Sequence, residues 1–202
     1  MKRPKLWKAR SLKDLRLSRL AKNIKIVFLD NDGVINSGQI VDPGGGNVVR
    51  IRCYYDGQGI TWLRAIGVRV VVLTGEDSSD TLMQLIERWN GLPSAKTGKL
   101  TPIEVFSGIP DTKLEVAKFL LKKYGLTFSV AAAMGDDIAD YNLLDRVQVP
   151  ACPAQAEQLV KDLVTRKQGF VAPRVGGNGA VRDFANFLLE SKQVDVRKLP
   201  IK

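Results

Sequence analysis

Two short acidic clusters follow apolar segments of the chain, and together they have the composition of a phosphate-transfer site. Asp30 and Asp32 come directly after the apolar run 24–29, and Asp136 and Asp137 come after a second such run. Side chains that follow the strands of a parallel sheet meet in the crevice beyond the carboxyl ends of those strands. The spacing therefore predicts that carboxylates from distant parts of the sequence lie in one crevice.

Asp30 and Asp32 are placed as covalent catalysis requires. A carboxylate at position 30 can attack phosphorus and form an acyl-phosphate, which divides one difficult displacement into two easier ones. Asp32 lies on the same side of an extended chain, so it can protonate the leaving alkoxide and later deprotonate water. The alternatives are a solvated turn or half a calcium loop, although residues 34–36 lack the further acidic ligands of an EF-hand loop.

Carboxylates gathered at one point repel each other unless a cation lies among them. Mg²⁺ prefers one or two carboxylates together with water and a phosphate oxygen. We therefore expect a Mg²⁺ cofactor, with side-chain ligands from Asp30 and Asp136, the backbone carbonyl of Asp32, and Asp137 as a second-shell or outer ligand. Asp140 is expected to fix this loop or to cap the helix that follows.

Three further residues could hold a phosphoryl group in the same crevice. Thr74 follows the apolar run 68–73 and offers a hydroxyl and a backbone N–H, and Gly75 leaves the backbone open to close approach. Lys113 stands near the start of an expected helix, where its ammonium could offset transition-state charge. Taken alone, a single lysine among 31 Lys and Arg residues is more often a surface charge.

The hydrophobic pattern alternates between expected strands and expected helices, which is typical of an α/β fold. The strands are predicted at 24–29, 68–73 and 129–134, and the helices at 57–66, 78–89, 112–124, 140–144, 154–163 and 179–189. Right-handed crossovers between such strands give a parallel sheet with helices on both faces.

The first 22 residues are expected to form a basic extension ahead of a catalytic domain at 23–190 and a tail at 191–202. The first 25 residues contain ten Lys or Arg and one Asp, and the whole chain has a net charge of +10. Residues 12–21 could form a short amphipathic helix that docks on the body or on a partner. A solvated tail is favoured, and binding to nucleic acid or to an anionic membrane surface is the alternative.

Composition excludes several classes of protein. The chain has no histidine, so histidine-based triads and histidine-bound zinc are excluded. No apolar run approaches the roughly 20 residues that cross a bilayer, and the N-terminus does not resemble a secretory signal. Cys53 and Cys152 match no metal spacing and are expected to be free thiols in a reducing, cytoplasmic compartment.

The ordered motifs resemble those of the haloacid dehalogenase (HAD) superfamily of phosphatases. The motifs are DNDGV at 30–34, LTG at 73–75, Lys113, and GDDIAD at 135–140. This resemblance covers roughly residues 24–165. It implies a Rossmann-like core, an aspartate nucleophile and a Mg²⁺ cofactor.

A narrower resemblance, to the 3-deoxy-D-manno-octulosonate 8-phosphate phosphatases, covers residues 26–189. It is carried by YDGQGI at 55–60 and by VGGNGAVRD at 175–183. It implies a phosphorylated sugar-acid substrate of lipopolysaccharide biosynthesis, a homotetramer, and a capless core with a small β-hairpin insert at 37–53. The residues expected to contact substrate, besides Gly75, are Tyr55, Asp56, Gly177 and Arg182.

The chain departs from this family pattern at one position near the substrate. The family usually has an arginine after the Ser/Thr-Gly of the second motif, and this chain has Glu76. An anion there would repel the carboxylate of a sugar acid if the two were close. A nonulosonate 9-phosphate, a nucleotide or the 3′-phosphate of a nucleic acid is therefore an alternative substrate, and a non-catalytic scaffold on the same fold is an alternative of another class.

The nucleophile assignment makes the first prediction. Replacing Asp30 with Asn removes the attacking carboxylate and should abolish phosphate release while the fold is retained. Phosphate release from an aryl phosphate, measured beside the circular dichroism of the variant, checks this. A rate near that of the wild type would refute covalent catalysis by Asp30.

Overall fold

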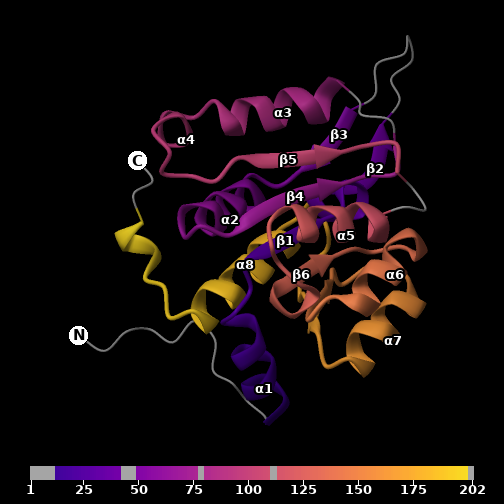
Figure 1. Cartoon of the computed structure of the whole chain (residues 1–202). Coiled ribbons are helices and arrows are strands. Elements are labelled where there is room, and N and C mark those ends of the chain that lie inside the picture. The colour runs from indigo at the N-terminus through magenta and orange to yellow at the C-terminus, as the bar shows by residue number, and fades with distance from the viewer. Residues whose placement is uncertain (1–11, 42–48, 77–79, 110–112, 200–202) are drawn as a thin grey trace.

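The computed structural model describes residues 12–41, 49–76, 80–109 and 113–199. Its centre is a sheet in which six strands are described, in the order β5-β4-β1-β6-β7-β8 (Figure 1). All neighbouring strands in this sheet are parallel. The strands are β1 (Ile26–Leu29), β4 (Arg69–Leu73), β5 (Ile103–Phe106), β6 (Ala131–Met134), β7 (Val149–Cys152) and β8 (Phe170–Val171).

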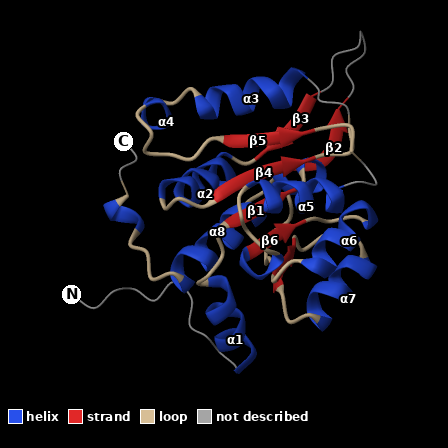
Figure 2. Cartoon of the chain, viewed as in Figure 1, coloured by secondary structure: helices blue, strands red, loops and turns tan. Residues whose placement is uncertain are grey.

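Helices cover both faces of the sheet, as the sequence predicts (Figure 2). The helices are α1 (Leu12–Ala21), α2 (Tyr54–Ala65), α3 (Asp80–Asn90), α4 (Pro93–Lys96), α5 (Lys113–Lys123), α6 (Ile138–Arg146), α7 (Gln158–Arg166) and α8 (Ala180–Ser191). Side chains alternate between the faces of a strand. Val27 and Leu29 accordingly pack with α1, α2, α3 and α8, while Ile26 and Phe28 pack with α5, α6 and α7.

Branched and aromatic side chains explain why β1 lies at the centre. All four of its residues are buried, and it pairs with β4 on one side and with β6 on the other. A strand buried on both faces reads as a continuous apolar run, which is the pattern of parallel sheets. The residues that follow β1, β4 and β6 are therefore delivered to one edge of the sheet.

A two-stranded antiparallel hairpin leaves the body between β1 and α2. It consists of β2 (Asn36–Val41) and β3 (Val49–Arg52), with Ile40 opposite Arg50. This agrees with the insert predicted at 37–53, of which residues 42–48 lie outside the described residues. The α/β class and the small hairpin insert are thus both confirmed.

Three strands of the sheet, β5, β7 and β8, were not predicted from the sequence. The charged Glu104 interrupts the apolar residues of β5, and β8 has only two residues. β7 contains Pro150, a residue that argues against a strand because it cannot donate a backbone hydrogen bond. The helices predicted at 140–144 and 154–163 also shift, to Ile138–Arg146 and Gln158–Arg166.

Helix α1 docks on the body of the protein. Leu17 and Ala21 are buried in the same core as α8, and Ser18 hydrogen-bonds Ser191 at 3.1 Å. Of the two docking modes considered for this helix, the structure supports packing on the body. None of the described helices combines the length and the apolar character of a membrane span.

Candidate active site

The turns after β1, β4 and β6 line one cavity of about 530 Å³ at the carboxyl edge of the sheet. Its walls include most of the residues predicted to act there: Asp30, Asp32, Gly33, Thr74, Gly75, Glu76, Lys113, Asp136, Asp137 and Asp140. Residues more than a hundred positions apart are brought together because β1 is hydrogen-bonded to both neighbouring strands. The crevice rule for parallel sheets accounts for this convergence.

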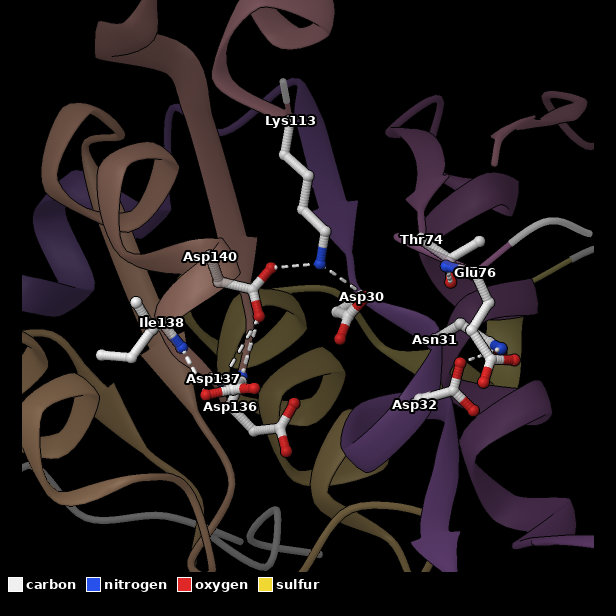
Figure 3. A network of polar contacts seen from close by, with 10 residues as sticks. All are labelled: Asp30, Asn31, Asp32, Thr74, Glu76, Lys113, Asp136, Asp137, Ile138 and Asp140. Atoms are coloured by element: carbon white, nitrogen blue, oxygen red, sulfur yellow. Dashed lines mark hydrogen bonds and ion pairs between the residues drawn. The ribbon is translucent and has the colours of Figure 1, made fainter. Parts of the chain in front are cut away.

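Lys113 bridges two carboxylates at the floor of the cavity (Figure 3). Its Nζ lies 2.8 Å from Oδ1 of Asp30 and 2.8 Å from Oδ1 of Asp140. The three side chains are between 4% and 9% exposed. A buried lysine is unusual unless it is paired, so this residue is no ordinary surface charge. It is placed at the first turn of α5, directly opposite the end of β1.

Asp140 organises the loop that follows β6. Its Oδ2 accepts hydrogen bonds from the backbone N–H groups of Asp136 and Asp137, at 3.1 and 3.4 Å. With its other oxygen bound to Lys113, both oxygens of Asp140 are engaged. Asp140 therefore fixes the loop, and as the N3 residue of a capping box it also helps to cap α6, so both roles expected for it are observed.

Asp137, predicted to be a second-shell or outer metal ligand, caps a helix in the structure, and its role toward the metal stays a prediction. It is exposed and is itself the N-cap of α6, where its Oδ1 accepts from the N–H of Ile138 at 2.6 Å. Capping satisfies an N–H that the helix leaves without an intrahelical partner, and a carboxylate also suits the positive end of the helix dipole. The cluster of described carboxylates close enough to share a metal ion is instead Asp30, Asp136 and Asp140.

Asp136 has an oxygen suited to a metal. Its Oδ1 is buried and has no hydrogen-bond partner among the described residues. Gly33, at φ 79°, lies against this carboxylate, and a Cβ at position 33 would collide with it. An uncompensated buried carboxylate oxygen costs free energy, which a bound cation would recover. The donor set therefore fits Mg²⁺, with Asp30 and Asp136 as the side-chain ligands and Asp140 in a supporting position.

The pKa values reflect an excess of negative charge in this dry site. Burial, followed by the nearby Asp140 carboxylate, raises the pKa of Asp30 to about 8, against the opposing effect of Lys113. Burial and then Asp140 also raise the pKa of Asp136 to about 7. Burial alone would lower the pKa of Lys113, but its two carboxylate partners outweigh burial and raise it. One ammonium therefore does not balance three carboxylates.

Asp32 lines the same cavity, on the other side of Asp30 from Asp136 (Figure 3). Its side chain is 30% exposed and accepts a hydrogen bond from Nδ2 of Asn31 at 3.0 Å. Nε of Arg50 lies 3.5 Å from Oδ1 of Asp32, and the same guanidinium pairs with Glu76. An exposed carboxylate beside the nucleophile can exchange protons with both substrate and water.

The predicted phosphate-binding residues are also in place. Thr74 is buried at the end of β4. Its N–H donates a hydrogen bond to the carbonyl of Phe106, and its hydroxyl accepts one from the N–H of Glu76 at 3.3 Å. Gly75 lines the cavity beside it. With Lys113, these groups surround the space in front of Asp30.

Four predicted substrate contacts lie outside this cavity lining. Asp56 is buried and accepts from the N–H groups of Gly179 and Arg182, at 3.0 and 2.8 Å, so it anchors the start of α8. Arg182 stacks 3.7 Å above the Trp62 ring. Tyr55 is exposed on α2, and Gly177 donates its N–H to Val34 at 2.9 Å. The structure thus gives these residues contacts within the fold.

Gln155 was missed by the sequence analysis. Its Nε2 donates to the carbonyl of Gly33 at 2.7 Å, and its Oε1 accepts from the N–H of Gly176 at 2.8 Å. It thereby connects the catalytic loop to the glycine-rich segment that precedes α8. Gln155 lies in the turn between β7 and α7, where a single glutamine has no sequence signal of its own, so only the geometry reveals this role.

Comparisons with known proteins place the fold and the motifs in context. No family model matches the chain. The 3-deoxy-D-manno-octulosonate 8-phosphate phosphatase KdsC of Haemophilus influenzae is 29% identical over 172 residues, which is 85% of this chain and 86% of that protein.

Solved structures share the architecture. The cobalt-bound deoxy-D-mannose-octulosonate 8-phosphate phosphatase (YrbI) of Haemophilus influenzae has a TM-score of 0.72 at 28% identity, covering 86% of this chain and 92% of that one. The Moraxella catarrhalis phosphatase, in complex with magnesium, phosphate and KDO, has a TM-score of 0.74 at 24% identity, covering 88% and 92%. The sequence and fold similarities agree with the resemblance that the motifs predict.

The carboxylate cluster predicts that Mg²⁺ binding depends on pH. Below the raised pKa values of about 7 and 8, Asp136 and Asp30 hold protons that a metal must displace. Without metal, the folded state keeps protons that the unfolded state releases, so the free energy of unfolding should fall as pH rises from about 4 to about 8. The increase in melting temperature caused by Mg²⁺ should therefore grow between about pH 6 and about pH 8.5.

Thermal unfolding with and without Mg²⁺ across this pH range measures the effect. Asp136→Asn should remove the Mg²⁺ response, whereas Asp145→Asn, which changes an exposed carboxylate on α6, should preserve it. An Mg²⁺ response that is independent of pH would contradict the prediction.

Proposed function

We propose that this chain, a phosphatase of the haloacid dehalogenase superfamily, hydrolyses the phosphate ester of a small sugar acid with the help of Mg²⁺. The observation that carries the proposal is the meeting of Asp30, Asp136 and Lys113 in one cavity. The similarity to 3-deoxy-D-manno-octulosonate 8-phosphate phosphatases over 85% of the chain supports the sugar-acid substrate. Mg²⁺, held by Asp30 and Asp136 with the Asp32 carbonyl, would neutralise charge so that an anionic phosphate can approach.

In the first step, a carboxylate oxygen of Asp30 forms a bond to phosphorus while the bond from phosphorus to the ester oxygen breaks. Asp32 gives its proton to that oxygen, so the sugar leaves as an alcohol. Lys113 and the Thr74 and Gly75 turn bind the phosphoryl oxygens and stabilise their developing charge. The product of this step is an aspartyl-phosphate.

In the second step, a water molecule attacks the phosphorus of the aspartyl-phosphate. Asp32 accepts a proton from that water, and the bond between phosphorus and the Asp30 oxygen breaks. Inorganic phosphate leaves and Asp30 returns as a carboxylate. The partial exposure of Asp32 suits this double role, because the residue must reach both the leaving group and the water.

The rival functions differ in the partner that they require. A nonulosonate 9-phosphate or a nucleotide would use the same cavity. The 3′-phosphate of a nucleic acid would draw on the basic residues 1–11, which lie outside the described residues. A non-catalytic scaffold would not need a buried lysine between two carboxylates, since that arrangement costs desolvation. We therefore favour the enzyme acting on a small substrate.

The test is a panel of phosphate esters assayed for phosphate release with Mg²⁺ and with EDTA. We expect 3-deoxy-D-manno-octulosonate 8-phosphate to give a kcat/KM at least about a hundredfold above that of an aryl phosphate, with no activity in EDTA. A nonulosonate 9-phosphate, a nucleotide and a 3′-phosphorylated oligonucleotide are the comparison substrates. A higher kcat/KM for any of these three would overturn the sugar-acid assignment.

We further propose that the chain assembles as a homotetramer through its hairpin. Apolar side chains on β2 and β3 are about half exposed: Ile40 56%, Val41 51%, Val49 51% and Ile51 49%. Exposed apolar patches of this kind mark interaction surfaces on otherwise polar proteins. Two open strand edges also favour pairing with another chain.

Sedimentation velocity tests this assembly. The wild type should sediment as a tetramer, and Ile40→Glu should shift it to smaller species because a charge cannot be buried there without a partner. Phe119→Glu, at a side chain 60% exposed on α5, is the control. A monomeric wild type would contradict the proposal.

A cytoplasmic location is proposed from the two cysteines, which are free thiols in the structure. Free thiols persist in reducing compartments. Fractionation of cells producing the tagged chain would test this, and recovery outside the cytoplasm would contradict it.

A further inference from the structure

A second hollow of about 150 Å³ lies between the hairpin strand β3 and helix α3. Three guanidinium groups line it, from Arg50, Arg52 and Arg88. The amides of Asn31 and Asn36 and an apolar floor complete the walls, and no described carboxylate is among them. We call this hollow the arginine pocket.

Two of the three arginines have charge available for a ligand. Among the side chains that the structure describes, no acidic group forms an ion pair with Arg52 or Arg88, and both arginines are exposed. Arg52 instead lies 5.7 Å from the Trp89 ring, which holds its guanidinium near the pocket. A planar guanidinium binds a carboxylate through two parallel hydrogen bonds, so this lining is suited to a carboxylate.

The third arginine forms a shared wall with the catalytic cavity. Arg50 lines the arginine pocket. Its Nε also lies 3.5 Å from Oδ1 of Asp32, and its guanidinium forms an ion pair with Glu76; both of these acidic residues line the catalytic cavity. Asn31 lies in the same wall and donates to Asp32. The anion at position 76 is therefore covered by a cation from the hairpin.

The chemistry of the substrate requires two anion sites. In a sugar acid phosphorylated at the far end of its carbon chain, the carboxylate and the phosphate are at opposite ends of the molecule. Lys113 and the carboxylate-bound metal serve the phosphate, but no other lysine or arginine is among the described residues that line the catalytic cavity. The arginine pocket supplies three such cations, and Arg50 connects its wall to the catalytic cavity.

We infer that the arginine pocket is a carboxylate subsite, with Arg88 and Arg52 as specificity-determining residues. This inference rests on the proposed function, which it deepens. The carboxylate comes either from the substrate itself or from the free sugar acid that the reaction releases. Arg50 stays with Glu76 and Asp32 and separates the two anion sites.

The first experiment compares Arg88→Gln with Arg146→Gln. Both arginines are exposed in the last turn of a helix, so the two changes have matched effects on charge and on the helix dipole. The readout is the ratio of kcat/KM for 3-deoxy-D-manno-octulosonate 8-phosphate to kcat/KM for an aryl phosphate without a carboxylate. Arg88→Gln should lower this ratio about tenfold through KM, as expected for loss of a charge-assisted hydrogen bond, and Arg146→Gln should leave it unchanged.

Arg88→Lys is a second variant that keeps the charge but loses the planar fork. It should give an intermediate ratio, and circular dichroism checks that each variant is folded. An equal ratio in wild type, Arg88→Gln and Arg52→Gln would overturn the subsite, as would an equal loss in Arg88→Gln and Arg146→Gln.

The second experiment does not depend on turnover. Titration calorimetry with 3-deoxy-D-manno-octulosonate, which carries no phosphate, is run on the Asp30→Asn protein with and without Arg88→Gln. Binding that Arg88→Gln removes supports the subsite and identifies the free acid as a ligand. If Arg88→Gln lowers the ratio of the two kcat/KM values but the free sugar acid does not bind, the pocket binds the carboxylate of the intact substrate.

If the wild type does not hydrolyse this ester, the proposed function fails, and the calorimetry alone then decides the subsite. Binding of the sugar acid that is lost with Arg88→Gln would still support it. No binding, or binding that Arg88→Gln leaves intact, would overturn it.

Discussion

The ammonium group of Lys113 lies between the carboxylates of Asp30 and Asp140 in a site that is almost closed to water. Each of these groups would be costly to bury without a partner, and in the site the three stabilise one another. The arrangement fixes the nucleophile at the end of β1 and, through Asp140, the backbone of the Asp136 loop. Because three carboxylates face one ammonium, the site has a net negative charge that favours a divalent cation.

Much of this centre could be predicted from the sequence because strand ends are easy to recognise. Long apolar runs identify β1, β4 and β6, and the polar residues that follow them must meet at one edge of a parallel sheet. The same logic assigned different roles to Asp137 and Asp140 but could not give the partners of their side chains, since those partners depend on how the loop after β6 folds. Only the structure shows that one caps α6 and that the other binds Lys113.

Contacts made by side chains from unrelated segments were beyond prediction. Gln155 joins Gly33 to Gly176, and Arg50 joins Asp32 to Glu76, although nothing in the local sequence marks either residue. The sequence did reveal the anomaly at position 76, where an acid stands near the expected substrate. The structure resolves that anomaly by placing an arginine of the hairpin against it. The strands β5, β7 and β8 could not be predicted for a different reason. Their own residues do not specify a strand, and pairing with a neighbouring strand gives them their extended structure.

The bond from Gln155 to the Gly33 carbonyl has a consequence for protein synthesis. The two residues are 122 positions apart, and Gly176, which completes the link, comes later still. A chain emerging from the ribosome therefore exposes Asp30 early but cannot brace the loop around it until nearly the whole domain has been translated. Fragments that end before Gly176 would therefore lack the link that joins the catalytic loop to the glycine-rich segment.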